Sequence, residues 1–400
     1  MKDVATVGVL GAGTMGAGIA QVAAEAGIEV LVHDPVDGAT DRARERIGGF
    51  LARKAEKGQL DADEAADALT RIRAVASLEA LAGADLVVEA IPEDIELKRD
   101  AFRRLDAVAS VESILATNTS SLSVARIAAA TGDPGRVIGM HFFNPVPLMA
   151  LVEVIAGPMT RPEIIDSVAL LARRLAKTPV VAADTPGFIV NRVARPYYLE
   201  AFRIVGEGGA SVEAVDDAMR GIGFKMGPFE LIDAIGADVN FTVSVSVFDQ
   251  FFGDPRYRPH PLQRMLVEAG RLGRKTSGGC YDYDSDGARG EAWAGLSRAA
   301  HVARRLEAAE IEARILATLV NEAASAVADG VATPDAIDTA MRLGTNWPDG
   351  PLAWGERIGL PSVIHTLDAL HASVPDGRYR ATPLLRSLAD TSGSFFANRA

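Results

Sequence analysis

A glycine-rich turn near the N-terminus constrains the fold more than any other feature of this sequence. Gly11-Ala12-Gly13-Thr14-Met15-Gly16 has the form GxGxxG, follows a β-branched apolar run at 4–10 and opens a run of small apolar residues at 14–26. A strand, a glycine turn and a helix in this order are typical of a dinucleotide-binding site. Gly11 permits the tight turn, Gly13 lets a pyrophosphate approach the backbone, and Gly16 lets the helix pack on the strand.

Further apolar runs alternate with helical stretches over the first half of the chain. They lie at 29–34, 85–91, 113–117 and 137–142, and a strand-like pair follows at 151–155 and 180–183. This alternation predicts an α/β, Rossmann-like, doubly wound parallel sheet.

An insertion at 38–72 is rich in Ala, Arg, Glu and Lys and interrupts the strands. It predicts two helices broken near Lys57-Gly58-Gln59. Such a hairpin either is simply solvated or overhangs the ligand.

From Pro186 onward the strand signals disappear and a repeat emerges. Glu200-Ala201 recurs as Glu322-Ala323, Gly227-Pro228 recurs as Gly350-Pro351, and Arg256-Tyr257-Arg258 recurs as Arg378-Tyr379-Arg380. Matches at a nearly constant offset indicate a duplicated, all-α C-terminal domain. The expected organisation is a nucleotide-binding domain at 1–185, a first helical copy at 186–283, a linker at 284–304 and a degenerate second copy at 305–400.

Asp34 ends the second expected strand, 18 residues after Gly16. A carboxylate at this place accepts the ribose hydroxyls and repels a 2′-phosphate, so it favours NAD over NADP.

His141 and Glu153 are the main candidates for acid–base chemistry. His141 ends an apolar strand on the carboxyl side, where doubly wound sheets bind ligands, and Glu153 stands alone among aliphatic residues in the next run. A lone buried carboxylate is costly without a partner, and a His–Glu pair satisfies both groups. The carboxylate would fix the tautomer and make the other ring nitrogen a better base. Taken alone, a histidine in the core or in a turn is the simpler interpretation.

Ser120 lies in Asn118-Thr119-Ser120-Ser121, which ends another strand on the same edge. Its hydroxyl could donate to a substrate, but a serine here also suits a helix N-cap. The motif itself leaves both interpretations open.

The charge and cysteine content exclude several classes of protein. A net charge of -12 over 400 residues argues against a broad nucleic-acid-binding face, and the single cysteine, Cys280, excludes an internal disulfide and a cysteine metal cluster. The N-terminus lacks the pattern of a signal peptide, and no run of about 18 apolar residues suggests a membrane span. We expect no metal site, no membrane association and a cytoplasmic location.

Several longer stretches resemble the (3S)-3-hydroxyacyl-CoA dehydrogenase family, which includes 3-hydroxybutyryl-CoA dehydrogenases. The matching stretches run from residue 8 to about 283 and are GAGTMGAGIAQVAAEAG, VVEAIPEDIELK, ATNTSSL, GMHFFNPVPLMALVEV, DTPGFIVNR, MGPFELID and GRKTSGG. The resemblance implies NAD-dependent oxidation of a 3-hydroxyacyl-CoA thioester to the 3-oxoacyl-CoA, and leaves the pathway open among fatty-acid β-oxidation, butyrate metabolism and the breakdown of aromatic acids.

The resemblance also implies roles for individual residues. The catalytic histidine falls on His141 with Glu153 as its partner, and Ser120 and Asn191 contact the substrate. Cofactor contacts fall on the glycine turn and on Asp34, Glu93, Lys98, Asn144 and Lys275. A lysine near the CoA moiety falls on Lys57, whereas Phe50 replaces a CoA-contacting serine of the family.

The second helical copy lacks equivalents of PGFIVNR and GRKTSGG, so it resembles a scaffold without a second site. In simpler relatives one helical domain per subunit builds a homodimer; here the second copy could take the partner's place, giving an internally pseudo-dimeric monomer. Two other functions stay open: a dehydrogenase of a hydroxy acid without CoA, such as a sugar acid or carnitine, and a non-catalytic NAD-binding scaffold.

Overall fold

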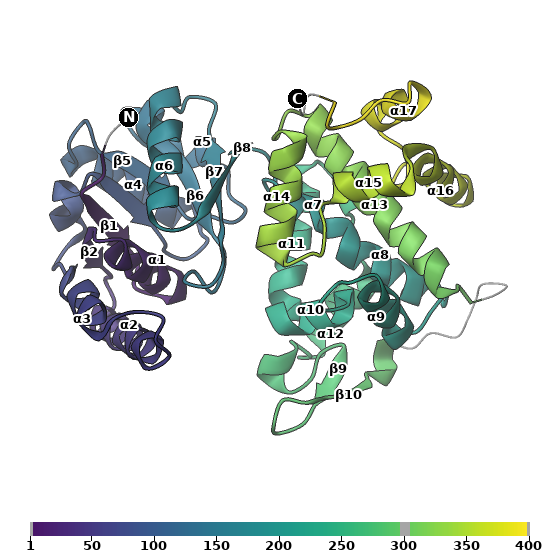
Figure 1. Ribbon diagram of the computed structural model, residues 1–400, viewed down its shortest axis with the longest axis horizontal. Coiled ribbons are helices and arrows are strands. Elements are labelled where there is room, and N and C mark those ends of the chain that lie inside the picture. The colour runs from purple at the N-terminus through teal and green to yellow at the C-terminus, as the bar shows by residue number, and fades with distance from the viewer. Residues whose placement is uncertain (1–2, 297–304, 398–400) are drawn as a thin grey trace. The chain divides into compact units, whose positions relative to one another are not determined.

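The computed structural model describes residues 3–296 and 305–397 and divides the chain into two compact units, Met1–Phe188 and Ile189–Ala400 (Figure 1). Each unit is described by itself below. The division falls three residues after the predicted end of the nucleotide-binding domain.

The first unit contains alternating strands and helices. In chain order they are β1 (Thr6–Leu10), α1 (Thr14–Glu25), β2 (Glu29–His33), α2 (Ala39–Glu56), α3 (Ala62–Thr70), β3 (Ile72–Ala74), β4 (Leu86–Glu89), α4 (Ile95–Val108), β5 (Ile114–Thr117), α5 (Val124–Ala128), β6 (Val137–Phe142), β7 (Leu151–Ala156), α6 (Pro162–Arg174) and β8 (Thr178–Ala183), with short 3-10 turns at Leu78–Gly83 and Pro134–Arg136.

The eight strands form one sheet in the order β3-β2-β1-β4-β5-β6-β7-β8. The predicted doubly wound sheet is confirmed, but the prediction that it is parallel throughout is wrong for one pair, because β6 and β7 run antiparallel. Only residues 143–150 join these two strands, and a parallel connection needs a crossover of about a dozen residues or more. The turn back places His141 directly opposite Glu153 in the register. The short edge strand β3 was not predicted.

The glycine turn has the conformation that its spacing predicts. Gly11 has φ +105°, where L side chains are strained, and a Cβ on Gly16 would lie 1.8 Å from the Gly11 carbonyl oxygen. Helix α1 therefore packs against the turn only because both positions are glycines.

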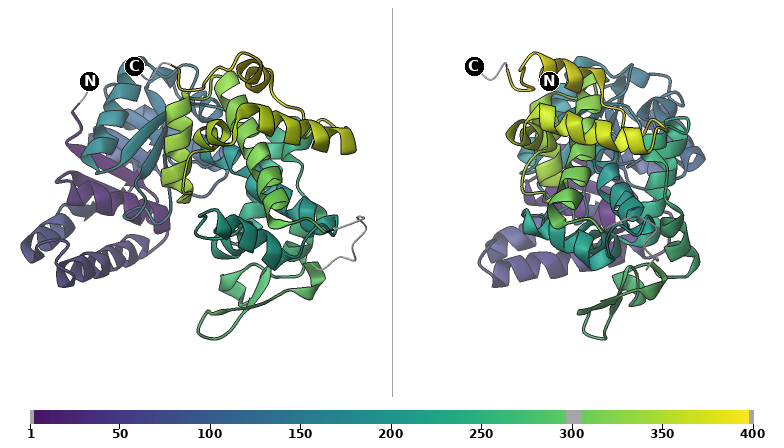
Figure 2. Two further views of the ribbon diagram at one scale, coloured as in Figure 1. Left: turned by 45° about the vertical axis from the view of Figure 1, so that its right-hand side comes forward. Right: turned by 90° about the vertical axis from the view of Figure 1, so that its right-hand side faces the viewer.

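The insertion after β2 forms the predicted helical hairpin, with α2 and α3 lying side by side next to α1 (Figures 1 and 2). Helix α2 ends at Glu56, at the predicted break, and Asp61 caps α3 in a capping box with Glu64. Only three side chains of α2 are buried, Ala43, Ile47 and Leu51. The rest of the helix presents a long polar face.

The described part of the second unit is helical apart from one small hairpin. Its elements are α7 (Val190–Val193), α8 (Arg195–Gly206), α9 (Val212–Gly221), α10 (Pro228–Ile235), α11 (Ala237–Gln250), α12 (Pro261–Glu268), β9 (Tyr281–Tyr283), β10 (Arg289–Ala292), α13 (Ala308–Ala328), α14 (Pro334–Thr345), α15 (Pro351–Ile358), α16 (Leu360–Ser373) and α17 (Pro383–Asp390), with 3-10 turns at Pro255–Tyr257, Arg274–Thr276 and Ala294–Leu296.

The sequence repeat is a structural repeat. Helices α8 to α12 recur in order as α13 to α17, and the repeated aspartates explain part of the match. Asp216 accepts hydrogen bonds from the backbone N–H groups of the first turn of α10, and Asp338 does the same for α15. A Cβ on Gly227 or Gly350 would collide with the capping aspartate, so each Gly-Pro pair belongs to a cap.

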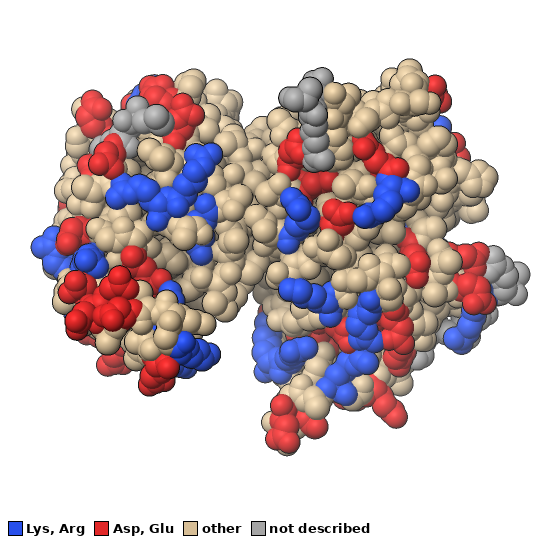
Figure 3. All heavy atoms as spheres, in the orientation of Figure 1, with Lys and Arg blue, Asp and Glu red and all other residues tan. Residues whose placement is uncertain are grey.

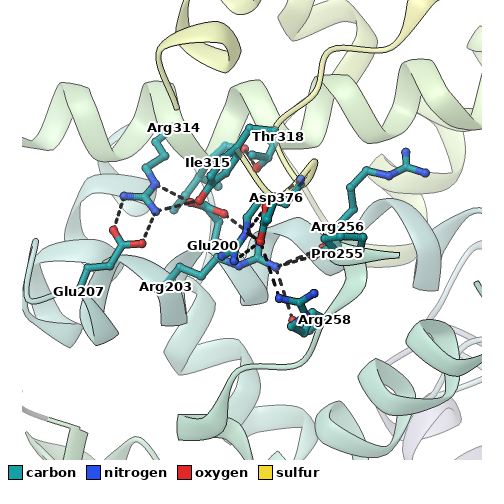
Figure 4. A network of polar contacts seen from close by, with 12 residues as sticks. Glu200, Arg203, Glu207, Pro255, Arg256, Arg258, Arg314, Ile315, Thr318 and Asp376 are labelled. Carbon is teal, nitrogen blue, oxygen red and sulfur yellow. Dashed lines mark hydrogen bonds and ion pairs between the residues drawn. The ribbon is translucent and has the colours of Figure 1, made fainter. Parts of the chain in front are cut away.

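Reciprocal buried ion pairs join the two copies. Arg192 of the first copy binds Glu322 of the second, with Nε 2.7 Å from Oε1, and it also binds Asp329. The equivalent Arg314 of the second copy points back to Glu200 and Glu207 of the first (Figure 4).

Two tyrosines complete this exchange. Tyr257 donates to Glu322 over 2.6 Å, and Tyr379 donates to Glu200 over 2.8 Å. Burial acts to raise the pKa of Glu200, but Arg314 and Arg203 outweigh it and hold that pKa below its ordinary value. The contact is self-complementary, as in a two-fold symmetric dimer, but it lies within one chain.

The structure groups the two predicted helical domains, and the linker predicted between them at 284–304, in one compact unit. Both copies belong to one compact unit, because the reciprocal contacts join them. Part of the expected linker is ordered, since β10 pairs with β9. Residues 297–304 of that linker, and 398–400 of the second copy, lie outside the described residues.

Acidic and basic side chains are interleaved over the visible surface of each unit (Figure 3). In the described ranges no single helix is long and apolar enough to span a membrane. Helices α10 and α11 meet that test only as a pair, and they are bent by 102°.

Candidate active site

His141 and Glu153 form a buried hydrogen-bonded pair on neighbouring strands. Nδ1 of His141 lies 2.7 Å from Oε2 of Glu153, and the two side chains are 7% and 0% exposed. An ionised carboxylate can only accept, so the shared proton lies on Nδ1 and the lone pair of the neutral ring lies on Nε2. The antiparallel turn between β6 and β7 thus produces a histidine with a fixed tautomer.

Aromatic rings and a backbone clamp hold this histidine in place. The ring centroids of Phe143 and Phe188 lie 4.6 Å and 6.0 Å from that of His141. Asn118, just after β5, accepts a hydrogen bond from the backbone N–H of Phe142 over 2.8 Å. The clamp ties the ends of β5 and β6 together, which brings the serine turn to the same sheet edge as His141.

The serine turn after β5 is organised by Glu93. Oε1 of Glu93 accepts hydrogen bonds from the Thr119 hydroxyl at 2.6 Å and from the backbone N–H groups of Ser120 and Ser121 at 2.9 and 3.0 Å. The N-cap of α5 is Ser123. Ser120 therefore does not serve as the helix cap, one of the two interpretations that its motif allowed.

Lys98 lies behind Glu93 and is 1% exposed. Its ammonium lies 3.3 Å from Glu93 and 2.6 Å from Glu89, which also accepts from the hydroxyl of Thr117. Burial acts to raise the pKa of Glu93, but the charge of Lys98 and hydrogen bonds from Thr119 and Ser120 outweigh it and lower that pKa. Glu93 is therefore held ionised by a buried lysine.

Glu89 is a site residue that the sequence reasoning missed. It is fully buried in the apolar run 85–91 and anchors Lys98. A lone carboxylate among aliphatic residues was the signal that identified Glu153, and the same signal marks Glu89.

The glycine turn and Asp34 form the wall of a pocket of about 310 Å³. One carboxylate oxygen of Asp34 accepts a hydrogen bond from the backbone N–H of Ala12 at 2.7 Å, and the other accepts one from the backbone N–H of Val36 at 2.9 Å. Gly13 precedes α1 with no side-chain cap, and a Cβ added to it would meet no atom within 4 Å. An open helix N-terminus beside a carboxylate is an arrangement that fits a dinucleotide.

Asn144 is exposed in the loop that follows β6. This loop rests on Lys177, another residue that the sequence reasoning missed, whose ammonium donates to the carbonyl oxygens of Val146 and Met149 at 2.6 and 2.8 Å. Burial lowers the pKa of Lys177. Lys177 supports the loop from the position just before the edge strand β8, a long-range contact that no local pattern reveals.

The hairpin carries Lys57 at the C-terminal end of α2, where its side chain is exposed. On the same helix Phe50 is 44% exposed, and the guanidinium carbon of Arg53 lies 4.7 Å from its ring centroid. The serine expected in the family is thus replaced by an aromatic ring paired with a cation.

Asn191 and Lys275 belong to the second unit. Asn191 lies on α7, and its carbonyl oxygen accepts a hydrogen bond from Arg195. Lys275 forms an ion pair with Asp238, with Nζ–O distances of 2.6 and 2.7 Å. Within the first unit the structure brings His141, Glu153, Ser120 and Glu93 to one sheet edge, while these two residues are placed by the helical unit.

Comparison with known families finds two matches that together cover most of the chain. Residues 6–185 match the NAD binding domain of 3-hydroxyacyl-CoA dehydrogenase, and residues 187–283 and 311–394 each match its C-terminal domain. The second of these C-terminal matches coincides with the second helical copy. The duplication inferred from the sequence is therefore confirmed.

Individual relatives agree with these matches. The chain is 38% identical to the 3-hydroxyadipyl-CoA dehydrogenase of Escherichia coli K12, over 97% of this chain and 98% of the relative. It is 47% identical to a probable 3-hydroxybutyryl-CoA dehydrogenase of Deinococcus radiodurans, over 69% of this chain and 99% of the relative. A crystal structure of 3-hydroxybutyryl-CoA dehydrogenase from Escherichia coli K12 superposes with a TM-score of 0.89 at 38% identity, covering 98% of this chain and 99% of that one.

Proposed function

The chain belongs to the 3-hydroxyacyl-CoA dehydrogenase family and is an NAD-dependent oxidoreductase, and on that premise we propose that His141 is its catalytic base. The observation that carries this proposal is the 2.7 Å contact between Nδ1 of His141 and the buried carboxylate of Glu153. That contact leaves Nε2 free to take a proton.

NAD, when bound, accepts the hydride from C3 of the hydroxyacyl group. Nε2 of His141 removes the proton of the 3-hydroxyl group, and the ring becomes an imidazolium. The carboxylate of Glu153 stabilises that positive charge without moving, because it already faces Nδ1. Phe143 and Phe188 pack beside the ring, and the His141 side chain is only 7% exposed.

Ser120 and Asn191 are proposed to hold the substrate oxygens and so set the approach of C3. Glu93 supports this role for Ser120, because it fixes the backbone of the serine turn. The glycine turn, Asp34 and Asn144 are proposed cofactor contacts. Because Lys98 is buried against Glu89 and Glu93, we assign it to the support of Glu93.

Substitution of the pair tests the assignment. His141→Ala and Glu153→Gln should each lower kcat by about 10²–10⁴-fold, the usual effect of losing a general base or its orienting group. The dissociation constant for NADH, measured by fluorescence titration, should change little. His365→Ala removes an exposed histidine of α16 and is the matched control. Near-normal turnover of either pair variant would overturn the assignment.

The CoA moiety of the substrate is proposed to contact the exposed end of α2 through Lys57. Lys57→Ala should raise KM for an acyl-CoA substrate and leave kcat nearly unchanged, because a contact remote from C3 contributes equally to the ground and transition states. The length of the acyl group is open to the same assay. The names of the relatives make 3-hydroxybutyryl-CoA and 3-hydroxyadipyl-CoA the two substrates to compare first.

We further propose that the protein is a monomer in which the second helical copy takes the place of a partner subunit. The reciprocal Arg192–Glu322 and Arg314–Glu200 pairs support this, because they already satisfy a self-complementary interface. Light scattering should give the mass of one chain. An obligate dimer formed through the first copy would contradict the proposal. The cytoplasmic location stays a prediction.

A further inference from the structure

A buried arginine lies one helical turn beyond Asn191. Arg195 opens α8 and is 4% exposed, and its Nε donates a hydrogen bond to the carbonyl oxygen of Asn191 over 2.8 Å. Ala194, which joins α7 to α8, keeps right-handed helical backbone angles, so the two residues belong to one continuous stretch of helix. Side chains four residues apart in a helix share a face. The cation of Arg195 therefore lies on the same face as the proposed substrate contact.

The guanidinium of Arg195 has no counter-ion among the described residues. Its Nη1 lies 3.3 Å from the carbonyl oxygen of Asn240 and 3.2 Å from Oγ of Ser244, and its central carbon lies 4.9 Å from the ring centroid of Tyr198. Within residues 3–296 and 305–397, no carboxylate oxygen lies within 4.0 Å of its nitrogens, and no acceptor contacts Nη2. Burial without an anion is costly for a cation, and it lowers the pKa of Arg195. Neutral groups alone therefore stabilise this charge.

An unused hydrogen-bond donor belongs to the same cluster. Asn240 is 3% exposed, and its Oδ1 accepts a hydrogen bond from Nε2 of Gln263 over 3.0 Å, which sets the orientation of the amide. Its Nδ2 is buried and has no hydrogen-bond partner in the described part of the chain. Gln263 also donates to Oγ of Ser244 over 3.3 Å, so hydrogen bonds connect these side chains to Arg195. An unbalanced cation and an unsatisfied N–H together suit an anionic acceptor.

The second helical copy shows that the helical fold does not need this polar cluster. All four equivalent positions of that copy are apolar and buried. The copy that lacks an equivalent of Asn191 therefore also lacks the cluster, which links the cluster to the proposed substrate contact. In sequence order, Arg195, Asn240, Ser244 and Gln263 correspond to Ala317, Val363, Leu367 and Leu385.

We propose that Arg195 and Asn240 bind a carboxylate at the far end of the acyl group, so that the enzyme prefers 3-hydroxyacyl-CoA thioesters of dicarboxylic acids. The proposal rests on the proposed function, in which Asn191 contacts the substrate. A carboxylate supplies the missing negative charge and accepts hydrogen bonds from the guanidinium and the amide. In a six-carbon acyl group this carboxylate is C6, three carbons beyond C3, so it can reach a residue one helical turn from the contact near C3.

Two thioesters of equal length test the proposal in the unsubstituted protein. 3-Hydroxyadipyl-CoA ends in a carboxylate, whereas 3-hydroxyhexanoyl-CoA ends in a methyl group. With NAD, kcat/KM for the adipyl thioester should be higher by about tenfold or more, the usual effect of a hydrogen bond to a charged group. Calorimetric titration of the NAD-saturated protein with adipyl-CoA and hexanoyl-CoA, which lack the 3-hydroxyl group and do not react, should show the same preference in the dissociation constants.

Substitutions assign the preference to the cluster. Arg195→Met should lower kcat/KM for the adipyl thioester by about 10–100-fold and for the hexanoyl thioester by less than about threefold. It should not lower the free energy of unfolding, because it removes an unbalanced buried charge. Arg195→Lys should restore part of the preference because it keeps the charge. Asn240→Val, which introduces the residue of the second copy, should act in the same direction as Arg195→Met by a smaller factor.

The control is Arg357→Met, which removes an exposed arginine of α15 that pairs with Asp349. It should leave the preference between the two thioesters unchanged. If Arg195→Met does not fold, Arg195→Lys and Asn240→Val decide the assignment, since both keep a side chain of similar size.

The outcomes separate this inference from the proposed function. Equal kcat/KM for the two thioesters, or equal losses on both in Arg195→Met, would show that the cluster only supports the helix around Asn191; the inference would be wrong and the proposed reaction would stand. If neither thioester is oxidised, the proposed function is wrong, and the calorimetric comparison decides the inference. Tighter binding of adipyl-CoA, lost in Arg195→Met, would support it, and equal binding of the two thioesters would overturn it.

Discussion

The two helical copies retain the same pairing residues and differ in the residues proposed for function. Arg192 and Arg314 occupy equivalent positions and form equivalent ion pairs. The residue just before each is Asn191 in the first copy, a proposed substrate contact, and Ala313 in the second. The arginine ion pair is therefore present on both sides of this interface, whereas the proposed substrate contact is present on one side only.

The same contrast appears along helices α11 and α16. Along α11, Val239 is 46% exposed and Phe241 is partly exposed, whereas the equivalent positions of α16 are Ser362 and Ile364. Further along, Val245 corresponds to Asp368, an exposed residue that pairs with Arg386. At two of these three positions the second copy has a polar residue where the first has an apolar one.

The largest expected effect concerns the reciprocal ion pairs. Glu322→Gln and Glu200→Gln should each lower the free energy of unfolding by about 3–5 kcal/mol, because each removes the more buried of the two carboxylates that bind Arg192 or Arg314. Urea denaturation measures the change, and Glu163→Gln, in an exposed pair, is the control. A loss in only one of the two variants would break the symmetry that we describe.

The next effect concerns the residue that differs between the copies. Asn191→Ala should lower kcat/KM by about 10²-fold, the usual effect of losing a hydrogen-bond donor aimed at a reacting oxygen. The reverse change, Ala313→Asn, lies at an exposed position and should alter neither activity nor stability by a measurable amount. Equal effects of the two substitutions on turnover would show that the second copy also takes part in catalysis.

The two helix caps should respond alike to overpacking. Gly227→Ala and Gly350→Ala place a Cβ within 2.3 Å of Asp216 and within 2.1 Å of Asp338, respectively. Each should lower the free energy of unfolding by about 1–3 kcal/mol. Thermal unfolding of the two variants checks this, with Gly221→Ala, which meets no atom within 4 Å, as the control.

The smallest expected effect is a difference between the two caps in how their contribution to stability depends on pH. Burial raises the pKa of Asp216 to about 7 and that of Asp338 to about 6, from an ordinary value of 3.8. A raised pKa in the folded state means that folded protein binds the proton more tightly. The stability from each group is therefore complete below about pH 3.8 and is lost as pH rises through the folded pKa.

Replacing either aspartate by asparagine removes its ionisation, so each variant isolates the pH-dependent stability that the aspartate contributes. Asp216→Asn should remove a decline in unfolding free energy that extends to about pH 7. Asp338→Asn should remove a decline that ends near pH 6. Above pH 7 the two declines should therefore differ by about 1.4 kcal/mol. Unfolding free energies measured from pH 4 to pH 8 give both curves. Identical curves for the two variants would show that the caps have the same environment.

Local patterns predicted much of the first unit and the duplication. The glycine turn, the helical hairpin and the opposition of His141 and Glu153 follow from spacing, strand ends and the cost of a lone buried carboxylate. The antiparallel turn between β6 and β7 was missed because apolar runs do not encode strand direction. Lys177 was missed because it contacts the loop after β6 only through tertiary packing.

The arginines of α2 show a different limit. In the sequence Arg42 and Arg46 are two charges in a helical hairpin that could be either solvated or placed over the ligand, and the pattern does not show which side chains would face Asp34. Only the packing of α2 next to α1 brings that face to the nucleotide pocket. The exchange of Arg192 and Arg314 between the copies was equally hidden, since a repeat predicts likeness and does not predict contact.

The most direct test of the proposed reaction follows NADH absorbance while the purified protein meets acetoacetyl-CoA, with free acetoacetate in a parallel sample. Oxidation of NADH with the thioester alone, lost in His141→Ala, is the result predicted for a 3-hydroxyacyl-CoA dehydrogenase acting through His141. Equal oxidation with the free acid would contradict the requirement for CoA and favour a hydroxy-acid substrate. No oxidation with either, in protein that binds NADH, would contradict the proposed reaction.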